Sequence, residues 1–207
     1  MQRKKGKLRE YVESFIIAAL IALFVRSFFV QAFKIPSSSM EPTLLVGDHL
    51  LVNRLSYVIK MPFTDWILYE ISKPKRGDVI VFRYPVDKSK DFIKRVIAVE
   101  GDEIEIKDKV VYVNGKRIED SHAFFSDPYV IPANLAPRDN FGPVKVPKDC
   151  YFVLGDNRDK SLDSRFWGFV RKEDLVGRAF ILYFSWNKNP QKVWEYVRWK
   201  RIGMLIK

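Results

Sequence analysis

Three consecutive serines, Ser37, Ser38 and Ser39, begin the segment SSSMEPTL. A serine hydroxyl can act as a nucleophile when a base takes its proton and when nearby donors stabilise the oxyanion that forms. Histidine is a poor candidate for that base, because His49 and His122 stand in no recognisable motif and the chain has no Gly-x-Ser-x-Gly elbow. The remaining possibility for activating a serine here is a lysine.

Lys94 meets the main requirement for a lysine base. The amine must be neutral near pH 7, and an apolar, water-poor setting lowers the pKa of a lysine enough to make it so. Lys94 lies within the segment DFIKRVIAV at 91–99, where Phe92 and Val96 share its face of a strand and Arg95 points to the other face. This pattern alone also fits a lysine on a half-exposed strand, so it leaves the role of Lys94 open.

A dense polar run, GDNRDKSLDSRFWG at 155–168, directly follows the apolar segment 151–154. The run could be a solvated turn, but it is longer than a turn requires and alternates acids, bases and hydroxyls. It supplies Ser161, which could orient a lysine amine, and it supplies Asp163 and Arg165, which could form an ion pair that holds the loop rigid. These residues favour a Ser-Lys site.

The elements that must position these side chains are predicted to be β-strands. Short segments rich in Val, Ile and Phe occur at 48–55, 78–84, 91–99, 103–112, 144–146, 151–154 and 178–184. The dipeptide Asn114-Gly115 predicts a type I′ hairpin. Residues 121–142, with three prolines, predict a long surface excursion, and 61–72 predicts a short helix or a membrane-facing loop. The predicted fold is mainly β: an antiparallel, sheet-like or barrel-like catalytic domain.

The N-terminal part predicts a membrane anchor. Residues 15–25 are eleven consecutive apolar residues, and the apolar character extends over 11–33. As one helix this segment would be about 34 Å long, enough to cross a hydrocarbon core of about 30 Å. Five basic residues in 1–10 place the N-terminus in the cytoplasm. A cleavable secretory signal is the alternative, with Val30-Gln31-Ala32 as its cleavage site.

These patterns divide the chain into four parts. We expect a cytoplasmic basic N-terminus at 1–10, a single transmembrane helix at 11–33, an extracytoplasmic peptidase domain at 34–187 and a basic C-terminal tail at 188–207. The tail and the stretch 61–68 could contact the lipid surface, although the tail could equally be a disordered end.

Composition excludes several other functions. The net charge is +11, but the basic residues are not confined to one block, so we expect no nucleic-acid partner. Cys150 is the single cysteine, which rules out an intrachain disulfide, and the two histidines lack the spacing of metal ligands. The expected protein is a monomer with no cofactor and no metal.

In its motifs the sequence resembles the bacterial type I signal peptidases, Ser-Lys enzymes of peptidase family S26. The resemblance runs from the anchor to about Phe184 and rests on an ordered series of motifs: PSSSMEPTL, GDHLLVNRLSY, RGDVIVFRYP, DFIKRVIAVEGD and GDNRDKSLDSRFWGFV. It implies that Ser39 is the nucleophile and Lys94 the general base. It further implies that the Ser37 hydroxyl and the Ser39 N–H stabilise the oxyanion, that Ser161 hydrogen-bonds the lysine, and that Asp163 and Arg165 support the site. Position 38 is Ser where the family often has Gly.

The resemblance also implies a substrate. Such an enzyme sits in the inner (plasma) membrane, in this sequence with one apparent span rather than the two of some family members. It removes signal peptides from exported preproteins after small residues at positions −3 and −1. Shallow apolar pockets would select those residues. The candidates for their walls, by position and by resemblance, are Phe33, Ile35, Leu44, Val81, Phe92 and Ile93. A serine placed a few residues past its own anchor would meet the cleavage site at the membrane surface, which favours retention of the anchor.

Two other functions stay open at this point. One is a specialised Ser-Lys processing peptidase with a restricted substrate. The other is a non-catalytic, membrane-tethered β module whose polar run is a binding loop. A self-cleaving repressor is disfavoured, because no DNA-binding helical domain precedes residue 39.

Overall fold

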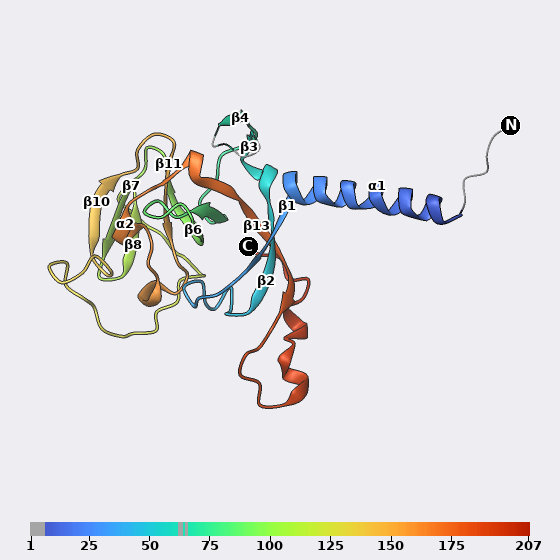
Figure 1. Cartoon of the computed structure of the whole chain (residues 1–207). Coiled ribbons are helices and arrows are strands. Elements are labelled where there is room, and N and C mark those ends of the chain that lie inside the picture. The colour runs from blue at the N-terminus through green and yellow to red at the C-terminus, as the bar shows by residue number, and fades with distance from the viewer. Residues whose placement is uncertain (1–6, 62–63, 65) are drawn as a thin grey trace.

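The structure, a computed structural model, describes residues 7–61, 64 and 66–207. Most of the predicted cytoplasmic segment at 1–10 therefore lies outside the described residues, as does Phe63 of the stretch predicted to contact lipid. What is described is an antiparallel β body from which one helix projects (Figure 1). The prediction of a mainly β, antiparallel fold is confirmed.

Within the described residues the strands form a large sheet, a smaller sheet and a hairpin, and all their pairings are antiparallel. In spatial order the large sheet contains β1 (Val30–Lys34), β2 (Asp48–Asn53), β13 (Leu175–Ser185), β5 (Val79–Arg83), β6 (Asp91–Val99), β11 (Cys150–Leu154) and β12 (Val170–Arg171). The smaller sheet contains β10 (Phe141–Lys145), β7 (Glu103–Lys107), β8 (Val110–Val113) and β9 (Lys116–Arg117), and the hairpin contains β3 (Val58–Lys60) and β4 (Ile67–Glu70).

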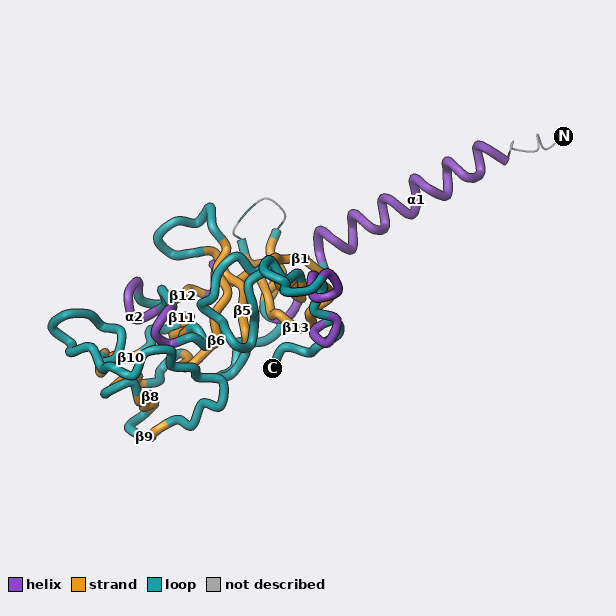
Figure 2. The backbone as a smooth tube through the Cα atoms, turned by 90° about the horizontal axis from the view of Figure 1, so that it is seen from below, coloured by secondary structure: helices purple, strands orange, loops and turns teal. Residues whose placement is uncertain are grey.

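The described helices are two α-helices and several short 3-10 turns. The α-helices are α1 (Lys7–Phe28) and α2 (Ser164–Trp167), and the 3-10 turns are Arg54–Ser56, Arg158–Lys160, Lys172–Asp174, Val193–Tyr196 and Trp199–Arg201. Figure 2 shows from below that α1 extends away from the strands, which gather on one side of the molecule.

The hairpin prediction is confirmed and one strand prediction is wrong. Asn114 and Gly115 have φ values of 55° and 73° and join β8 to β9 as a two-residue turn. The predicted strand at 103–112 is instead a second hairpin, because the chain turns at Asp108 and Lys109, with φ of 46° and 70°. A lysine in the left-handed region is uncommon, so composition gave no warning of this turn. The helix considered for 61–72 is also wrong, since β4 lies there and pairs with β3.

The predicted helical segment at 11–33 ends early. Helix α1 stops at Phe28, and Val30–Lys34 forms β1, an edge strand paired with β2 along its whole length. Pairing with β2 satisfies the backbone of these residues, which an extension of the helix could not do while also reaching the sheet. Among the residues that the structure describes, no helix combines the length and the hydropathy that a membrane-crossing segment needs.

The C-terminal segment is part of the folded domain, so the predicted boundary at 187 is wrong. Ile206 is 8% exposed and packs in one core cluster with Met40 and Leu44. Arg201 reaches the buried Asp48 at 2.6 Å, and Leu205 bridges to Ile181 of β13. Figure 1 shows this segment, in red, leaving β13, forming a lobe below the body and returning to it.

Candidate active site

The loop between β1 and β2 carries the three serines and is anchored in the core by two of its own apolar side chains. Met40 is 1% exposed and Leu44 is fully buried, and both pack in a cluster with Leu50 and Val52 of β2. Ser39, just before Met40, is 8% exposed and so lies at the edge of the core. The buried Met40 thereby holds Ser39 in place.

Lys94 lies against Ser39. It comes from β6, in the interior of the large sheet, and its Nζ donates a hydrogen bond of 2.7 Å to Oγ of Ser39. A second hydrogen bond of 3.0 Å runs from Nζ to the backbone oxygen of Ile93. The side chains that the sequence singled out as nucleophile and base are therefore in direct contact.

The surroundings of Lys94 favour the neutral amine. Burial lowers the pKa of Lys94 to about 8, with Asp163 and Asp156 opposing this shift and Arg165 adding to it. The Nζ atom lies 5.6 Å from the centre of the Phe92 ring, which confirms that Phe92 lies beside Lys94. Within the described chain Lys94 forms no ion pair, since both of its hydrogen bonds go to uncharged oxygens. An amine with this pKa is substantially neutral near pH 8 and can accept the proton of an adjacent hydroxyl.

The polar run at 155–168 contributes the predicted ion pair. Nε and Nη2 of Arg165 donate to the two carboxylate oxygens of Asp163, each at 2.8 Å, and both side chains are buried. The same carboxylate accepts a hydrogen bond of 3.1 Å from the backbone N–H of Gly155. The pair therefore ties the start of the run to its later part, as a rigid site requires.

A second buried ion pair was not predicted. Arg95 of β6 donates through Nε and Nη2 to Asp156 at 2.8 and 2.7 Å, and both side chains are almost fully buried. The sequence did contain a signal for it: an arginine in an apolar strand requires a buried counter-charge, and Asp156 follows the next buried strand.

The predicted hydrogen bond between Ser161 and Lys94 is wrong for this structure. Oγ of Ser161 is buried and has no hydrogen-bond partner among the described residues, because the Lys94 amine is directed to Ser39 and Ile93 instead. Ser161 nevertheless borders the site. A Cβ atom added to Gly155 would lie 2.2 Å from Oγ of Ser161 and 2.4 Å from the backbone oxygen of Ser39.

The other serine assigned to the oxyanion, Ser37, is exposed on the loop two residues before Ser39. Its hydroxyl forms no hydrogen bond within the described residues, so it is free to meet a ligand. The Ser39 N–H likewise donates to no group in the part of the chain that the structure describes.

Five of the six residues predicted to contact substrate lie together. Phe33 and Ile93 are half-buried against one core cluster, and the buried members of that cluster include Ile35, Leu44 and Val81. Ile35, Leu44 and Val81 are at most 3% exposed, so Phe33 and Ile93 are the members of this group that remain partly accessible. Phe92 is not part of this group.

Phe92 packs in a different cluster, with Phe82, and stacks on Tyr84 at a ring distance of 4.3 Å. Alternation along β6 explains this, because Phe92 and Ile93 point to opposite faces. The structure therefore separates Phe92 from the predicted pocket and leaves it as a neighbour of Lys94.

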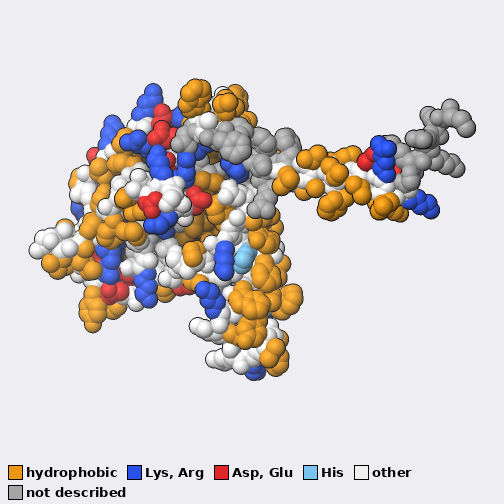
Figure 3. Space-filling view, in the orientation of Figure 1, with side chains coloured by type: hydrophobic (Ala, Val, Ile, Leu, Met, Phe, Trp, Pro, Cys, Tyr) orange, Lys and Arg blue, Asp and Glu red, His pale blue; other side chains and the backbone are white. Residues whose placement is uncertain are grey.

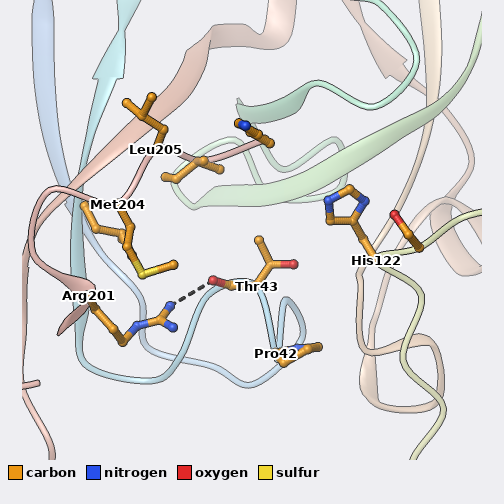
Figure 4. Close-up of a pocket in the computed structure, with 10 residues that line it drawn as sticks. Pro42, Thr43, His122, Arg201, Met204 and Leu205 are labelled. Carbon is orange, nitrogen blue, oxygen red and sulfur yellow. Dashed lines mark hydrogen bonds between the residues drawn. The ribbon is translucent and has the colours of Figure 1, made fainter.

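A cavity of about 280 Å³ lies beside the serine loop and was not predicted. Figure 4 shows Pro42 and Thr43 on one side and Met204 and Leu205 on the other, with His122 across the opening.

Within the residues described, no group of three or more acidic, His or Cys side chains is arranged to hold a metal ion.

Comparison with known proteins gives consistent matches over most of the chain. A family model described as "Signal peptidase, peptidase S26" matches residues 8–186. Signal peptidase I of Pseudomonas fluorescens is 36% identical over an alignment of 232 positions, and this alignment covers 98% of this chain and 81% of that protein. Signal peptidase I of Aquifex aeolicus is 38% identical over 228 residues, covering 86% and 84%.

This chain was also compared with the crystal structure of a signal peptidase I from Enterococcus faecalis V583. The two sequences are 30% identical, and the match covers 53% of this chain and 98% of the crystallised chain. Its TM-score of 0.42 is too low to carry an argument about the fold.

Proposed function

Because the chain belongs to the signal peptidase family, peptidase S26, and is a serine endopeptidase that removes signal peptides from preproteins, we propose that Ser39 is its nucleophile and Lys94 its general base. The observation that supports this assignment is the 2.7 Å hydrogen bond between Lys94 Nζ and Ser39 Oγ in a buried setting. In the reactive form the proton lies on the other side of that bond, so that the hydroxyl donates to the neutral amine.

The reaction follows from that contact. Lys94 accepts the hydroxyl proton while Oγ of Ser39 attacks the carbonyl carbon of the scissile peptide bond. The resulting ammonium then returns the proton to the leaving amine, which becomes the new N-terminus of the mature protein. Water then attacks the acyl-enzyme while Lys94 accepts its proton, and the ammonium returns that proton to Oγ of Ser39 as the ester bond breaks and the carboxyl group of the signal peptide is released.

The oxyanion is assigned to the Ser39 N–H and the Ser37 hydroxyl. Support comes from the family resemblance and from the absence of any other partner for these two donors among the described residues. Asp163 and Arg165 keep the wall of the site in place.

Small residues at −3 and −1 of the substrate fit the apolar surface beside the serine. In this proposal the tightly packed core residues Ile35, Leu44 and Val81, at most 3% exposed, form a closed floor that admits only a short side chain. Phe33 and Ile93 form its partly open edge. A pocket with this floor discriminates against large residues because it has no space for them.

Signal peptidases of this family are generally membrane-bound. The feature of this chain that supports membrane contact is α1, along which apolar side chains such as Phe15, Ile17 and Leu20 are 57–74% exposed (Figure 3). Such a surface is costly in water and favourable in lipid. Although α1 as described does not combine the length and the hydropathy of a membrane-crossing helix, this exposed surface and the basic segment before it lead us to propose that α1 lies in the membrane, with the N-terminal side in the cytoplasm and the β body outside it.

Retention of α1 also agrees with the sheet. Cleavage after Ala32 would remove Val30, Gln31 and Ala32, which pair with β2 and form most of β1. The mature enzyme is therefore expected to keep its N-terminal helix.

Cleavage of an exported preprotein by the full chain in detergent, with the new N-terminus identified by sequencing, tests these roles. Wild type should cut after a small residue and Ser39→Ala should not cut, whereas His49→Ala and His122→Ala should cut at nearly the wild-type rate. Cleavage by Ser39→Ala would overturn the assignment of the nucleophile. A panel of unrelated preproteins distinguishes a general enzyme, which cuts most of them, from a specialised one, which cuts only one kind.

A further inference from the structure

Asn157 makes two contacts to the backbone beside the nucleophile. Its N–H donates to the backbone oxygen of Ser39 at 3.1 Å, and its side-chain Nδ2 donates to the backbone oxygen of Ser38 at 3.3 Å. The residue is 2% exposed. One buried residue thus holds both peptide groups that flank Ser39.

The orientation of the Asn157 amide is determined by its partner. A rotation that exchanged oxygen and nitrogen would bring one acceptor against another at Ser38. In the observed orientation the amide oxygen is buried with no hydrogen-bond partner among the described residues. A buried acceptor without a partner is unfavourable, so the contact to Ser38 is retained at a cost in stability.

Holding the oxygen of Ser38 also directs the N–H of Ser39. The two groups belong to one planar trans peptide and point in opposite directions, so fixing one fixes the other. The proposed oxyanion donor is that same N–H. Oxyanion stabilisation depends on donors that are already in place when charge develops, and small misplacements of catalytic groups are expensive.

The serine loop contributes one further contact at this point. The N–H of Glu41 donates to the oxygen of Ser38 at 3.1 Å, closing a turn over Ser39 and Met40. That turn lies within the loop itself, whereas Asn157 comes from the run after β11 and so connects the loop to another part of the fold. Asn157 thus hydrogen-bonds the backbone of Ser39 to the run that also carries Asp163 and Arg165.

We infer that Asn157 is a positioning residue that orients the Ser39 N–H toward the oxyanion. The inference rests on the proposed function, because it assigns to Ser39 the oxyanion donor of the same reaction.

The test compares Asn157→Ala with a matched control, Asn140→Ala, in the full chain in detergent. Nδ2 of Asn140 also donates to a backbone oxygen, that of Ile131 at 3.1 Å, but in the surface excursion. Asn157→Ala should lower kcat about tenfold to a hundredfold and change KM by less than about twofold. Asn140→Ala should change neither, although it also loses an Nδ2 contact to a backbone oxygen, together with the hydrogen bond of 3.0 Å that its Oδ1 accepts from the N–H of Asp108.

Two further readouts separate positioning from general damage. The affinity of a peptide aldehyde, whose adduct with Ser39 places an oxyanion in the hole, should fall in Asn157→Ala by about the same factor as kcat. The midpoint of the pH–rate profile should stay where it is in wild type, because Lys94 is untouched. A kcat equal to that of wild type in Asn157→Ala would overturn the inference. A lower kcat accompanied by lower thermal stability but by unchanged aldehyde affinity would overturn it too.

Failure of the proposed function gives a different result. If wild type cut no preprotein, or if Ser39→Ala still cut, the proposed function would fail. The inference about the backbone would then be tested by the amide ¹⁵N and ¹H shifts of Ser39 in serine-labelled protein. These should move in Asn157→Ala and not in Asn140→Ala, and unchanged shifts would contradict it.

Discussion

Lys94 and Arg95 are neighbouring buried basic residues on opposite faces of β6, and their hydrogen-bond partners differ. On one face Arg95 donates to both oxygens of Asp156 and to the backbone oxygens of Gly77 and Lys207. On the other face Lys94 donates to the Ser39 hydroxyl and to one backbone oxygen. Both side chains are at most 3% exposed. One cation is fully compensated, and the other is not.

The difference separates a structural charge from a chemical one. A buried guanidinium with a bidentate carboxylate keeps its charge and connects β6 to the loop after β11. A buried amine without a carboxylate partner loses its preference for the charged form, which is why burial lowers the pKa of Lys94 to about 8. Burial alone therefore does not point to a catalytic group, whereas burial without a compensating charge singles out Lys94 as the candidate base.

The largest expected effect comes from removing the uncompensated cation. Lys94→Met keeps a chain of similar length and deletes the amine, so preprotein cleavage should fall by at least about 10³-fold. The free energy of unfolding should not fall, since no buried carboxylate loses a partner. Cleavage assays and urea unfolding of the same preparation measure both quantities. More than a few per cent of wild-type activity would show that Lys94 is not the base.

Removing the compensated cation should reverse that pattern. Arg95→Met leaves Asp156 buried without a counter-charge and should lower the free energy of unfolding by about 3–5 kcal/mol. Adding Asp156→Asn to this variant should recover part of the loss, because the uncompensated charge disappears. Urea unfolding of the single and double variants is the measurement. A loss below about 1 kcal/mol in Arg95→Met would mean that the pair does little for the fold.

Substitution of Gly155 tests the loop after β11, which contacts both Arg95 and the Ser39 loop. Gly155 precedes Asp156, and an alanine Cβ there would overlap Oγ of Ser161 and the backbone oxygen of Ser39. Displacement of Ser39 by a few tenths of an ångström or more should lower kcat about tenfold to a hundredfold. Gly177→Ala is a useful comparison, because its Cβ would collide with Asn53 in the sheet and should reduce stability rather than turnover. Normal turnover in Gly155→Ala would contradict the close approach.

The smallest expected effect is a shift in pH dependence. Phe92→Asp places a carboxylate near Lys94, which stabilises the ammonium, raises the pKa of Lys94 and moves the rise in activity to higher pH by about one unit. Phe92→Asn is the matched control, since it loses the same ring without adding a charge. The pH–rate profiles of the two variants should differ in midpoint. Equal midpoints would mean that Lys94 is not the group that titrates in the profile.

Much of this account could be read from the sequence, because the decisive side chains lie in regular strands or in one distinctive run. Alternation along 91–99 placed Phe92 beside Lys94 and Arg95 on the opposite face, as the structure has them. The charges of Asp163 and Arg165 predicted their ion pair. Strand periodicity also predicted most of the large sheet.

The rest depended on distant contacts that periodicity does not encode. The end of α1 was misplaced because the apolar residues of β1 continue the apolar run of the helix, and only pairing with β2 distinguishes them. The C-terminal segment looked like a basic tail because several of its anchors, Asp48 for Arg201 and Met40 and Leu44 for Ile206, lie more than a hundred residues away. Ser161 was predicted to hydrogen-bond the Lys94 amine, but that amine donates to two other oxygens, those of Ser39 and Ile93.

A direct titration of Lys94 tests the central claim that an uncompensated buried amine is the base. In full-length protein labelled with ¹³C-lysine, the Cε resonance that is missing from Lys94→Met belongs to this residue, and its shift can be followed from pH 6 to 11. We predict a midpoint near 8, with activity rising through the same pH as the amine loses its proton. A midpoint near the ordinary lysine value of about 10.4 would contradict the claim.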